Sequence, residues 1–136
     1  MDRPFSLLLV EDESILRGLV AQFLRREGYH IVEAEDGVAG LDLFENYGPF
    51  DVVVTDLMMP RMGGLQLCGE IRAIAADQPI VVCSAAFSPQ PEQILLDLGI
   101  DGFLRKPYHP EALLSRLRRE LGGRRRDEPA PARKVG

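Results

Sequence analysis

Carboxylate, hydroxyl and ammonium groups stand at the ends of four short apolar runs in this chain. Glu11 and Asp12 follow the first run, and Asp56 ends the run Val-Val-Val-Thr-Asp. Ser84 and Lys106 close two later runs. A carboxylate at the end of a buried segment costs free energy unless it meets a cation, hydrogen-bond donors or a reacting group. Residues of these types, brought together, can bind a divalent cation that also contacts a phosphate oxygen.

Three carboxylates would crowd one small space if the run before Glu11 and the run ending at Asp56 form neighbouring strands. Parallel strands lie ~4.8 Å apart, and two unit charges about 5 Å apart repel by ~3 kcal/mol at an effective dielectric of 20. Lys106 supplies one positive charge, which is too little for three acids. A divalent cation fits the shortfall, and Mg²⁺ is favoured over Ca²⁺ because few protein ligands are offered.

The segments that must position these groups alternate between strand and helix patterns. Apolar, strand-like runs occupy residues 5–10, 29–34, 52–56, 79–83 and 101–104. The intervening segments have helical spacing. This alternation predicts an α/β fold: a doubly wound, five-stranded parallel sheet with helices on both faces. Functional groups in such a sheet collect at the carboxyl ends of the strands.

Apolar spacing and capping residues mark the predicted helices. After the first strand, apolar residues recur at helical spacing: Ile15, Leu16, Leu19, Val20, Phe23 and Leu24. Asp36 is a good N-cap for a helix that Gly48-Pro49 ends. The predicted inner face of that helix is Val38, Leu41 and Phe44. Pro89 and Pro91 leave the start of the fourth helix open.

Composition narrows the class of protein. The 136 residues are 46% hydrophobic and 27% charged, which is typical of a globular domain. A net charge of −5 disfavours nucleic acid as a partner. No apolar stretch approaches the ~20 residues that span a bilayer. Cys68 and Cys83 have no metal-ligand spacing, and we interpret them as reduced core residues of a cytoplasmic protein.

The end of the chain differs from the rest. Residues 123–136 contain three consecutive arginines and a Pro-Ala-Pro-Ala stretch. We therefore predict a folded domain over residues 1–122 and a flexible Arg/Pro-rich tail over residues 123–136. The isolated His30 and His109 are interpreted as surface or capping residues rather than ligands.

Four short motifs occur in order at the predicted strand ends. They are Leu8-Leu9-Val10-Glu11-Asp12-Glu13, Thr55-Asp56-Leu57-Met58-Met59-Pro60, Val82-Cys83-Ser84-Ala85 and Leu104-Arg105-Lys106-Pro107. Each motif alone is weak, but the ordered set is specific. Over about residues 5–121 the chain resembles a bacterial two-component response-regulator receiver domain of the chemotaxis-regulator-like kind. The resemblance implies a flavodoxin-like strand order, 2-1-3-4-5.

The resemblance also implies roles for the strand-end residues. Asp56 would accept a phosphoryl group from the phosphohistidine of a sensor histidine kinase or phosphotransfer protein. Asp12 and Asp56 would bind Mg²⁺ directly, and Glu11 would act largely through a water molecule. The backbone carbonyl of Met58 would be a further ligand. Lys106 would pair with the phosphoryl oxygens, and the peptide bond that follows it would be cis.

A conformational switch is the second implication. Ser84 would move toward the phosphoryl group and donate a hydrogen bond to it, and Phe103 would rotate inward. This would change the face formed by the fourth helix, fifth strand and fifth helix, where a downstream protein would bind. The chain would be a monomer or a weak phosphorylation-dependent dimer, with no membrane partner.

The expected chemistry is that of a phosphoacceptor rather than an enzyme. The chain would phosphorylate itself from a donor and lose the phosphoryl group slowly. Slow loss is expected because Ala86 and Met58 offer no polar group to orient a water molecule. Gly63 also departs from the many relatives that carry an acid at that position, which would loosen the loop.

Other interpretations stay open. The chain could be the N-terminal receiver fragment of a longer DNA-binding response regulator, or a pseudo-receiver that takes no phosphate. An aspartyl-phosphate phosphatase is disfavoured because Met58 stands where that family carries a second acid. Each residue alone also has a plainer explanation: Glu11-Asp12 as a helix cap, Asp56 as a turn residue, Ser84 as a satisfied hydroxyl, Lys106 as a surface lysine and Phe103 as core.

Overall fold

A computed structural model describes residues 3–122, and its strands form one parallel sheet. The strands are β1 (Ser6–Val10), β2 (His30–Ala34), β3 (Val52–Asp56), β4 (Ile80–Ser84) and β5 (Gly102–Arg105). The helices are α1 (Ser14–Arg26), α2 (Gly37–Tyr47), α3 (Gly64–Ile74), α4 (Pro89–Asp97) and α5 (Pro110–Glu120). The strand order is β2-β1-β3-β4-β5, which confirms the predicted flavodoxin-like α/β fold. The predicted tail, residues 123–136, lies outside the described residues.

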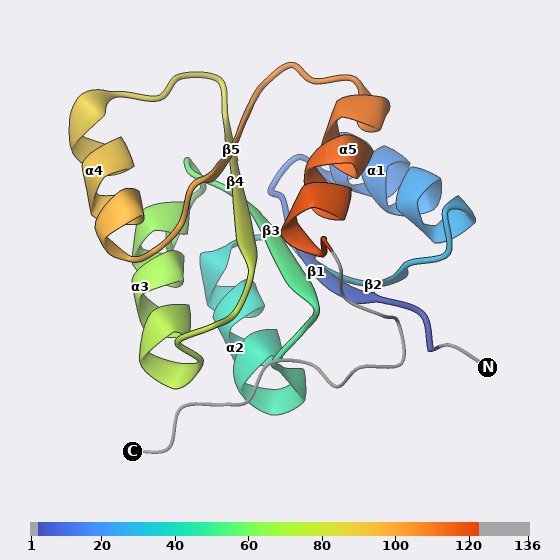
Figure 1. Cartoon of the computed structure of the whole chain (residues 1–136), viewed down its shortest axis with the longest axis horizontal. Helices are drawn as coiled ribbons and strands as arrows, with labels where there is room; N and C mark the ends of the chain where they lie inside the picture. The colour runs from blue at the N-terminus through green and yellow to red at the C-terminus, as the bar shows by residue number, and fades with distance from the viewer. Residues whose placement is uncertain (1–2, 123–136) are drawn as a thin grey trace.

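Helices cover both faces of the sheet. Helices α1 and α5 lie on one face, and α2, α3 and α4 lie on the other (Figure 1). Alternate residues of each strand enter opposite cores: Leu7 and Leu9 pack toward α1 and α5, whereas Leu8 and Val10 pack toward α2 and α3. A strand that is buried on both sides must be apolar throughout, which explains the unbroken apolar runs in the sequence.

The predicted inner face of α2 is partly wrong, and the apolar residues of α1 are only partly buried. In α1, Ile15 is 80% exposed and Leu19 is 60% exposed, while Val20 and Leu24 are buried. The apolar residues of α1 form two neighbouring stripes, and only one of them reaches the sheet. In α2, Val38 is likewise exposed, although the helix buries Phe44 completely.

The boundaries of α2 match the prediction, and α4 and α5 each begin at a proline. The Asp36 side chain accepts a hydrogen bond from the Ala39 N–H (2.8 Å), and α2 ends just before Gly48. Helix α4 begins at Pro89, where a missing N–H costs nothing because the first turn has no internal partner for it. His109 caps α5 by accepting from the Glu111 N–H at 3.2 Å.

Both cysteines are buried and free, as predicted. Burial raises the pKa of Cys68 to about 12, so its thiol stays protonated and unreactive. Burial also raises the pKa of Cys83. None of the helices within residues 3–122 is long and apolar enough to cross a lipid bilayer.

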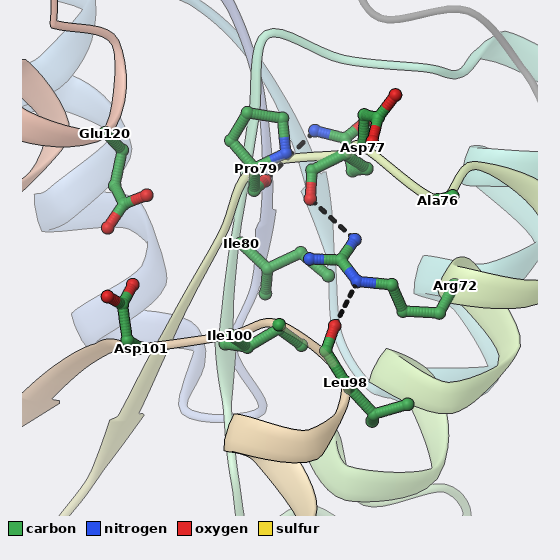
Figure 2. A pocket seen from close by; sticks show the side chains of 11 residues that line it. Arg72, Ala76, Asp77, Pro79, Ile80, Leu98, Ile100, Asp101 and Glu120 are labelled. Atoms are coloured by element: carbon green, nitrogen blue, oxygen red, sulfur yellow. Dashed lines mark hydrogen bonds between the residues drawn. The ribbon is translucent and has the colours of Figure 1, made fainter.

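Arg72 ties helices α3 and α4 together at the amino end of β4. Its guanidinium donates to the Leu98 carbonyl (Nε, 2.6 Å) and to the Gln78 carbonyl (Nη1, 2.7 Å), beside a cavity of about 410 Å³ (Figure 2). Gln78 is fully buried, and its side chain accepts from the Phe50 N–H and donates to the Pro79 carbonyl. This network fixes the C-terminal end of α4 against the sheet.

We expect Arg72→Met to lower the free energy of unfolding by about 2 kcal/mol, because two carbonyls lose their donor. Urea unfolding monitored by circular dichroism measures the change. Arg26→Met is the matched control, since Arg26 is exposed in the last turn of α1, and its effect is expected to stay within about 0.5 kcal/mol. Equal effects of the two substitutions would show that the Arg72 network contributes no stability.

Candidate functional site

The register of the sheet brings the predicted strand-end residues to one edge. Val10 pairs with Thr55 across β1 and β3, so the residues that follow them, Glu11 and Asp56, lie side by side. Asp56 pairs in turn with Cys83 of β4. Parallel pairing therefore converts positions far apart in the sequence into one cluster.

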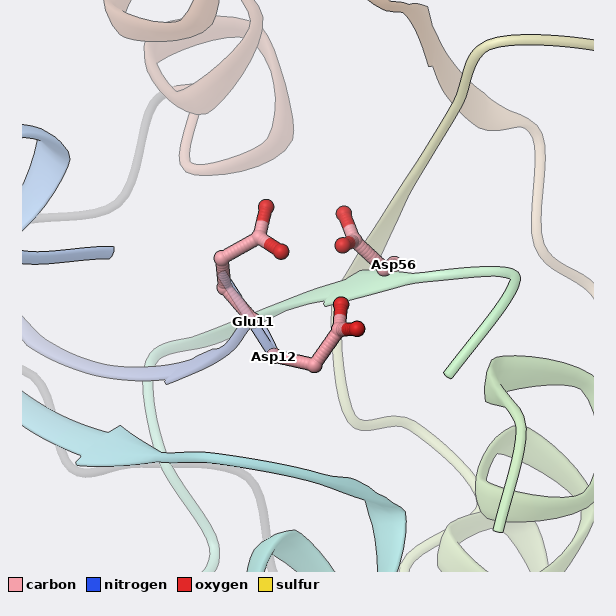
Figure 3. Close-up of side chains that lie close together, drawn as sticks. All are labelled: Glu11, Asp12 and Asp56. Carbon is pink, nitrogen blue, oxygen red and sulfur yellow. The ribbon is translucent and has the colours of Figure 1, made fainter. Parts of the chain in front are cut away.

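Three carboxylates meet at this edge. Oxygen atoms of Glu11, Asp12 and Asp56 all lie within 4.8 Å of one another, and the side chains converge in Figure 3. Glu11 is 3% exposed and Asp56 is 6% exposed, whereas Asp12 lies at the exposed rim. Such a set of hard oxygen donors, with one open side, fits a small divalent cation.

Lys106 contacts both buried acids. Its Nζ donates to Glu11 Oε1 at 2.6 Å and to Asp56 Oδ2 at 2.8 Å. Burial by itself lowers the pKa of Lys106, but the hydrogen bonds to Asp56 and Glu11 outweigh burial and raise it. The ammonium is therefore charged, and the peptide bond to Pro107 is cis, as the resemblance implies.

One ammonium does not satisfy this cluster. Burial, followed by the neighbouring Glu11, raises the pKa of Asp56 to about 8 despite the opposing effect of Lys106. Burial also acts to raise the pKa of Glu11, but hydrogen bonds with Asp56 and Lys106 outweigh it and lower that pKa. The two carboxyls thus compete for one positive charge. A second source of positive charge is required before all three acids are ionised.

The remaining predicted ligands line the same cavity, which has a volume of about 390 Å³. Asp12, Asp56, Met58, Ser84 and Lys106 are all among its lining residues. The Met58 side chain is largely exposed to solvent. A cavity of this size, open to solvent on the side of Asp12, can admit an ion together with a phosphate-sized group.

Ser84 and Phe103 have other partners in this structure. The Ser84 hydroxyl donates to the Ala86 carbonyl (2.8 Å) and accepts from the Ala86 N–H (3.2 Å). Phe103 stacks on Phe87, with ring centroids 5.2 Å apart, and packs against the core on the α3–α4 side. Phe103 therefore lies away from the acidic cavity.

Sequence reasoning missed several residues that support the site. Arg17 Nη1 donates to the Glu11 carbonyl at 2.7 Å, and the Thr55 hydroxyl donates to the Asp56 carbonyl at 3.0 Å. Phe87 is the stacking partner of Phe103. Nothing in their spacing separates these residues from ordinary helix, strand or loop positions, because their role depends on where the backbone places them.

Comparison with known proteins agrees with this geometry. The response regulator receiver domain family matches residues 7–118. The chain is 41% identical over 115 residues to the response regulator MprA of Mycobacterium sp. (strain KMS), covering 85% of this chain and 50% of that protein. It is 38% identical over 126 residues to MprA of Mycobacterium tuberculosis (strain ATCC 25177 / H37Ra), covering 93% and 53%. The chain thus spans about half the length of these curated relatives.

A solved structure gives the same result. The chemotaxis response regulator CheY4 of Vibrio cholerae superposes with a TM-score of 0.76 and 31% identity, covering 87% of this chain and 99% of that chain. Receivers are phosphoacceptor modules rather than classical enzymes, and the family implies a histidine-kinase partner. The sequence match, the strand order and the acidic cluster together establish that the chain belongs to the response regulator receiver domain family of two-component systems.

Proposed function

We propose that Asp56 accepts a phosphoryl group from the phosphohistidine of a sensor histidine kinase or phosphotransfer protein, with Mg²⁺ as cofactor. One observation carries the proposal: Asp56 is a buried carboxylate that contacts Lys106 at 2.8 Å within a cluster of three acids. A carboxylate oxygen of Asp56 attacks phosphorus and forms a P–O bond. The P–N bond breaks, and its electron pair stays on the imidazole nitrogen of the donor.

The residues around Asp56 would then act by position and charge. Asp12 and Asp56 would hold Mg²⁺ directly, Glu11 would act largely through a water molecule, and the Met58 carbonyl would be a further ligand. The bound ion would supply charge neutralisation for the carboxylates and the phosphoryl oxygens, which accounts for much of the rate of phosphoryl transfer. Lys106 leaves its bond with Asp56 and pairs with the phosphoryl group.

The proposed switch begins at the Ser84 hydroxyl. Phosphorylation adds about −1.5 to −2 charges, which gives this hydroxyl a stronger acceptor than the Ala86 carbonyl. When Ser84 turns to the phosphoryl group, its two bonds with Ala86 are lost. Phe87 is the next residue, so the change reaches its stack with Phe103. The added charge biases two states of this loop.

The output would be read on the face formed by α4, β5 and α5. A downstream protein target binds there in one of the two states, in a cytoplasmic monomer or a weak phosphorylation-dependent dimer. A second candidate is the N-terminal receiver part of a longer DNA-binding response regulator. It is favoured by the relatives' length, about twice the matched region. Reading the natural gene beyond the codon for residue 136 decides between them.

Incubation with Mg²⁺ and acetyl phosphate is expected to add one phosphoryl group to the native chain and none to Asp56→Asn, because the amide is not a nucleophile. Intact-protein mass spectrometry measures the gain. Asp42→Asn, at an exposed acid of α2, is the matched control and should be phosphorylated normally. An unmodified native chain, or a phosphorylated Asp56→Asn variant, would contradict the proposal.

Asp56→Asn should also stabilise the metal-free protein, and more so at higher pH. The folded-state pKa of Asp56, about 8, lies above the unfolded value of about 3.9, so folding favours the protonated form. That contribution is complete below pH ~4 and is lost as the pH rises through ~8. The advantage of Asp56→Asn should therefore grow by about 4 kcal/mol between pH 5 and pH 9, because each pKa unit corresponds to about 1.4 kcal/mol. Urea unfolding in EDTA measures it, and a pH-independent difference would contradict this origin.

The phosphorylated protein should lose its phosphoryl group slowly, because neither Ala86 nor Met58 can orient a water molecule. Met58→Asn keeps the backbone carbonyl and adds an amide at an exposed position, so it should speed hydrolysis about tenfold. The half-life is measured by mass spectrometry after the donor is removed. Loss of phosphate from the native protein within seconds would refute the expectation.

A further inference from the structure

The loop of residues 57–63, which carries Met58 from β3 to α3, is held closely at its end. The Gly64 N–H donates to the Leu57 carbonyl at 2.8 Å. Gly64 also packs so tightly on the backbone of Asp56 that a Cβ atom there would overlap its carbonyl oxygen. The two ends of the loop therefore lie close together, where β3 ends and α3 begins. The path of the residues between them depends on the contacts that those residues make.

The middle of the loop has a strained backbone. Arg61 has φ of +67°, and among residues 3–122 no other residue except glycine has a positive φ. The Met62 N–H donates to the Pro60 carbonyl at 2.8 Å, which closes a three-residue turn around Arg61. Turns of this kind with positive φ are rare for a residue with a side chain, and they persist only where surrounding contacts hold them.

Those contacts come from the start of α2. Arg61 Nε donates to Asp36 Oδ2 at 2.7 Å, and Arg61 Nη2 pairs with the same carboxylate. The other oxygen of Asp36 accepts from the Ala39 N–H, so the carboxylate is itself fixed to the helix. Gly37 lets the loop approach, because a Cβ atom there would overlap the backbone of Met62.

We infer that the Arg61–Asp36 ion pair positions the metal site, by holding the loop in the shape that presents the Met58 carbonyl to the acidic cavity. The inference rests on the proposed function and extends it to two residues that do not line this cavity. Arg61 lies three residues after Met58 in the strained turn. Gly63 provides no side chain to brace the loop, so the brace comes from α2. Both residues are positioning residues, not catalytic ones.

Mg²⁺ affinity of the unphosphorylated protein tests the inference. It is measured from amide shifts in ¹⁵N-labelled protein for the native chain, Arg61→Ala, Asp36→Asn and the double variant. Asparagine can still cap α2 through its one side-chain oxygen, but the NH₂ group that replaces the second carboxylate oxygen cannot accept from Arg61. Each single variant should bind Mg²⁺ about tenfold more weakly, at the lower end of the range for groups that orient metal ligands. The double variant should be no weaker than Arg61→Ala, because that substitution already removes the pairs of Arg61 with Asp36 and with Glu35 (3.8 Å).

The two single variants also separate positioning from a plain charge effect. Loss of the Arg61 cation would tighten Mg²⁺ binding through space, whereas loss of the Asp36 anion would weaken it. Positioning predicts weakening in both. Arg25→Ala is the matched control, since Arg25 pairs with Glu33 at 3.2 Å and donates to a backbone carbonyl on β2, and it should leave Mg²⁺ affinity unchanged.

The outcomes distinguish the inference from the proposed function. A native chain whose amide shifts do not respond to Mg²⁺ overturns the proposed function. A native chain that responds, with unchanged affinity in Arg61→Ala and Asp36→Asn or with opposite changes in the two, overturns the inference alone. Hydrogen exchange should also quicken at the Met62 amide in both variants and not in Arg25→Ala. If Arg61→Ala fails to fold, Asp36→Asn decides the result.

Discussion

The structure depends on one interaction, the pairing of the Lys106 ammonium with two buried carboxylates. Glu11 and Asp56 are buried at the ends of adjacent strands, and the Lys106 side chain donates a hydrogen bond to each of them. Their burial would otherwise be unfavourable by several kcal/mol for each ion. Because Lys106 carries one charge and Asp12 adds a third acid, the edge of the sheet stays anionic. A cation therefore complements the charge of this site, and a bound cation can in turn attract a phosphoryl group. The role of the sheet is to hold the carboxylate oxygens in place.

Much of the fold could be predicted from the sequence, because a parallel sheet that is covered on both faces requires unbroken apolar strands. The predicted run of residues 5–10 became Ser6–Val10, and residues 79–83 became Ile80–Ser84. The helix faces were less certain. Ile15 and Leu19 obey helical spacing as well as Val20 and Leu24 do, and spacing alone does not say which stripe meets the sheet. That choice depends on the helix's rotation, which is set by packing against α5 and the strands.

The candidate site also has a part that could be predicted from the sequence and a part that could not. Its acids and Lys106 could be predicted because the carboxyl ends of parallel strands meet at one edge of the sheet, and the family resemblance supplied the order that makes β1 and β3 neighbours. The residues that support them could not. The bond between Arg61 and Asp36 joins positions 25 apart in the sequence, and it exists only because an irregular loop folds back on a helix start. The stack of Phe87 on Phe103 similarly depends on the path of the β4–α4 loop.

Helix α4 is held very differently at its two ends. At its C-terminal end, Arg72 fixes the Leu98 carbonyl to α3 and to the turn before β4. At its N-terminal end, no side-chain hydrogen bond caps the helix, and the chain leads directly back to Ala86 and Ser84. A movement of Ser84 would then act at the N-terminal end of α4, which contacts the core through the Phe87–Phe103 stack, while Arg72 holds the C-terminal end at Leu98. Helix α4 would tilt rather than slide. At the surface that a partner protein contacts, its displacement would be largest near Pro89 and smallest near Asp97.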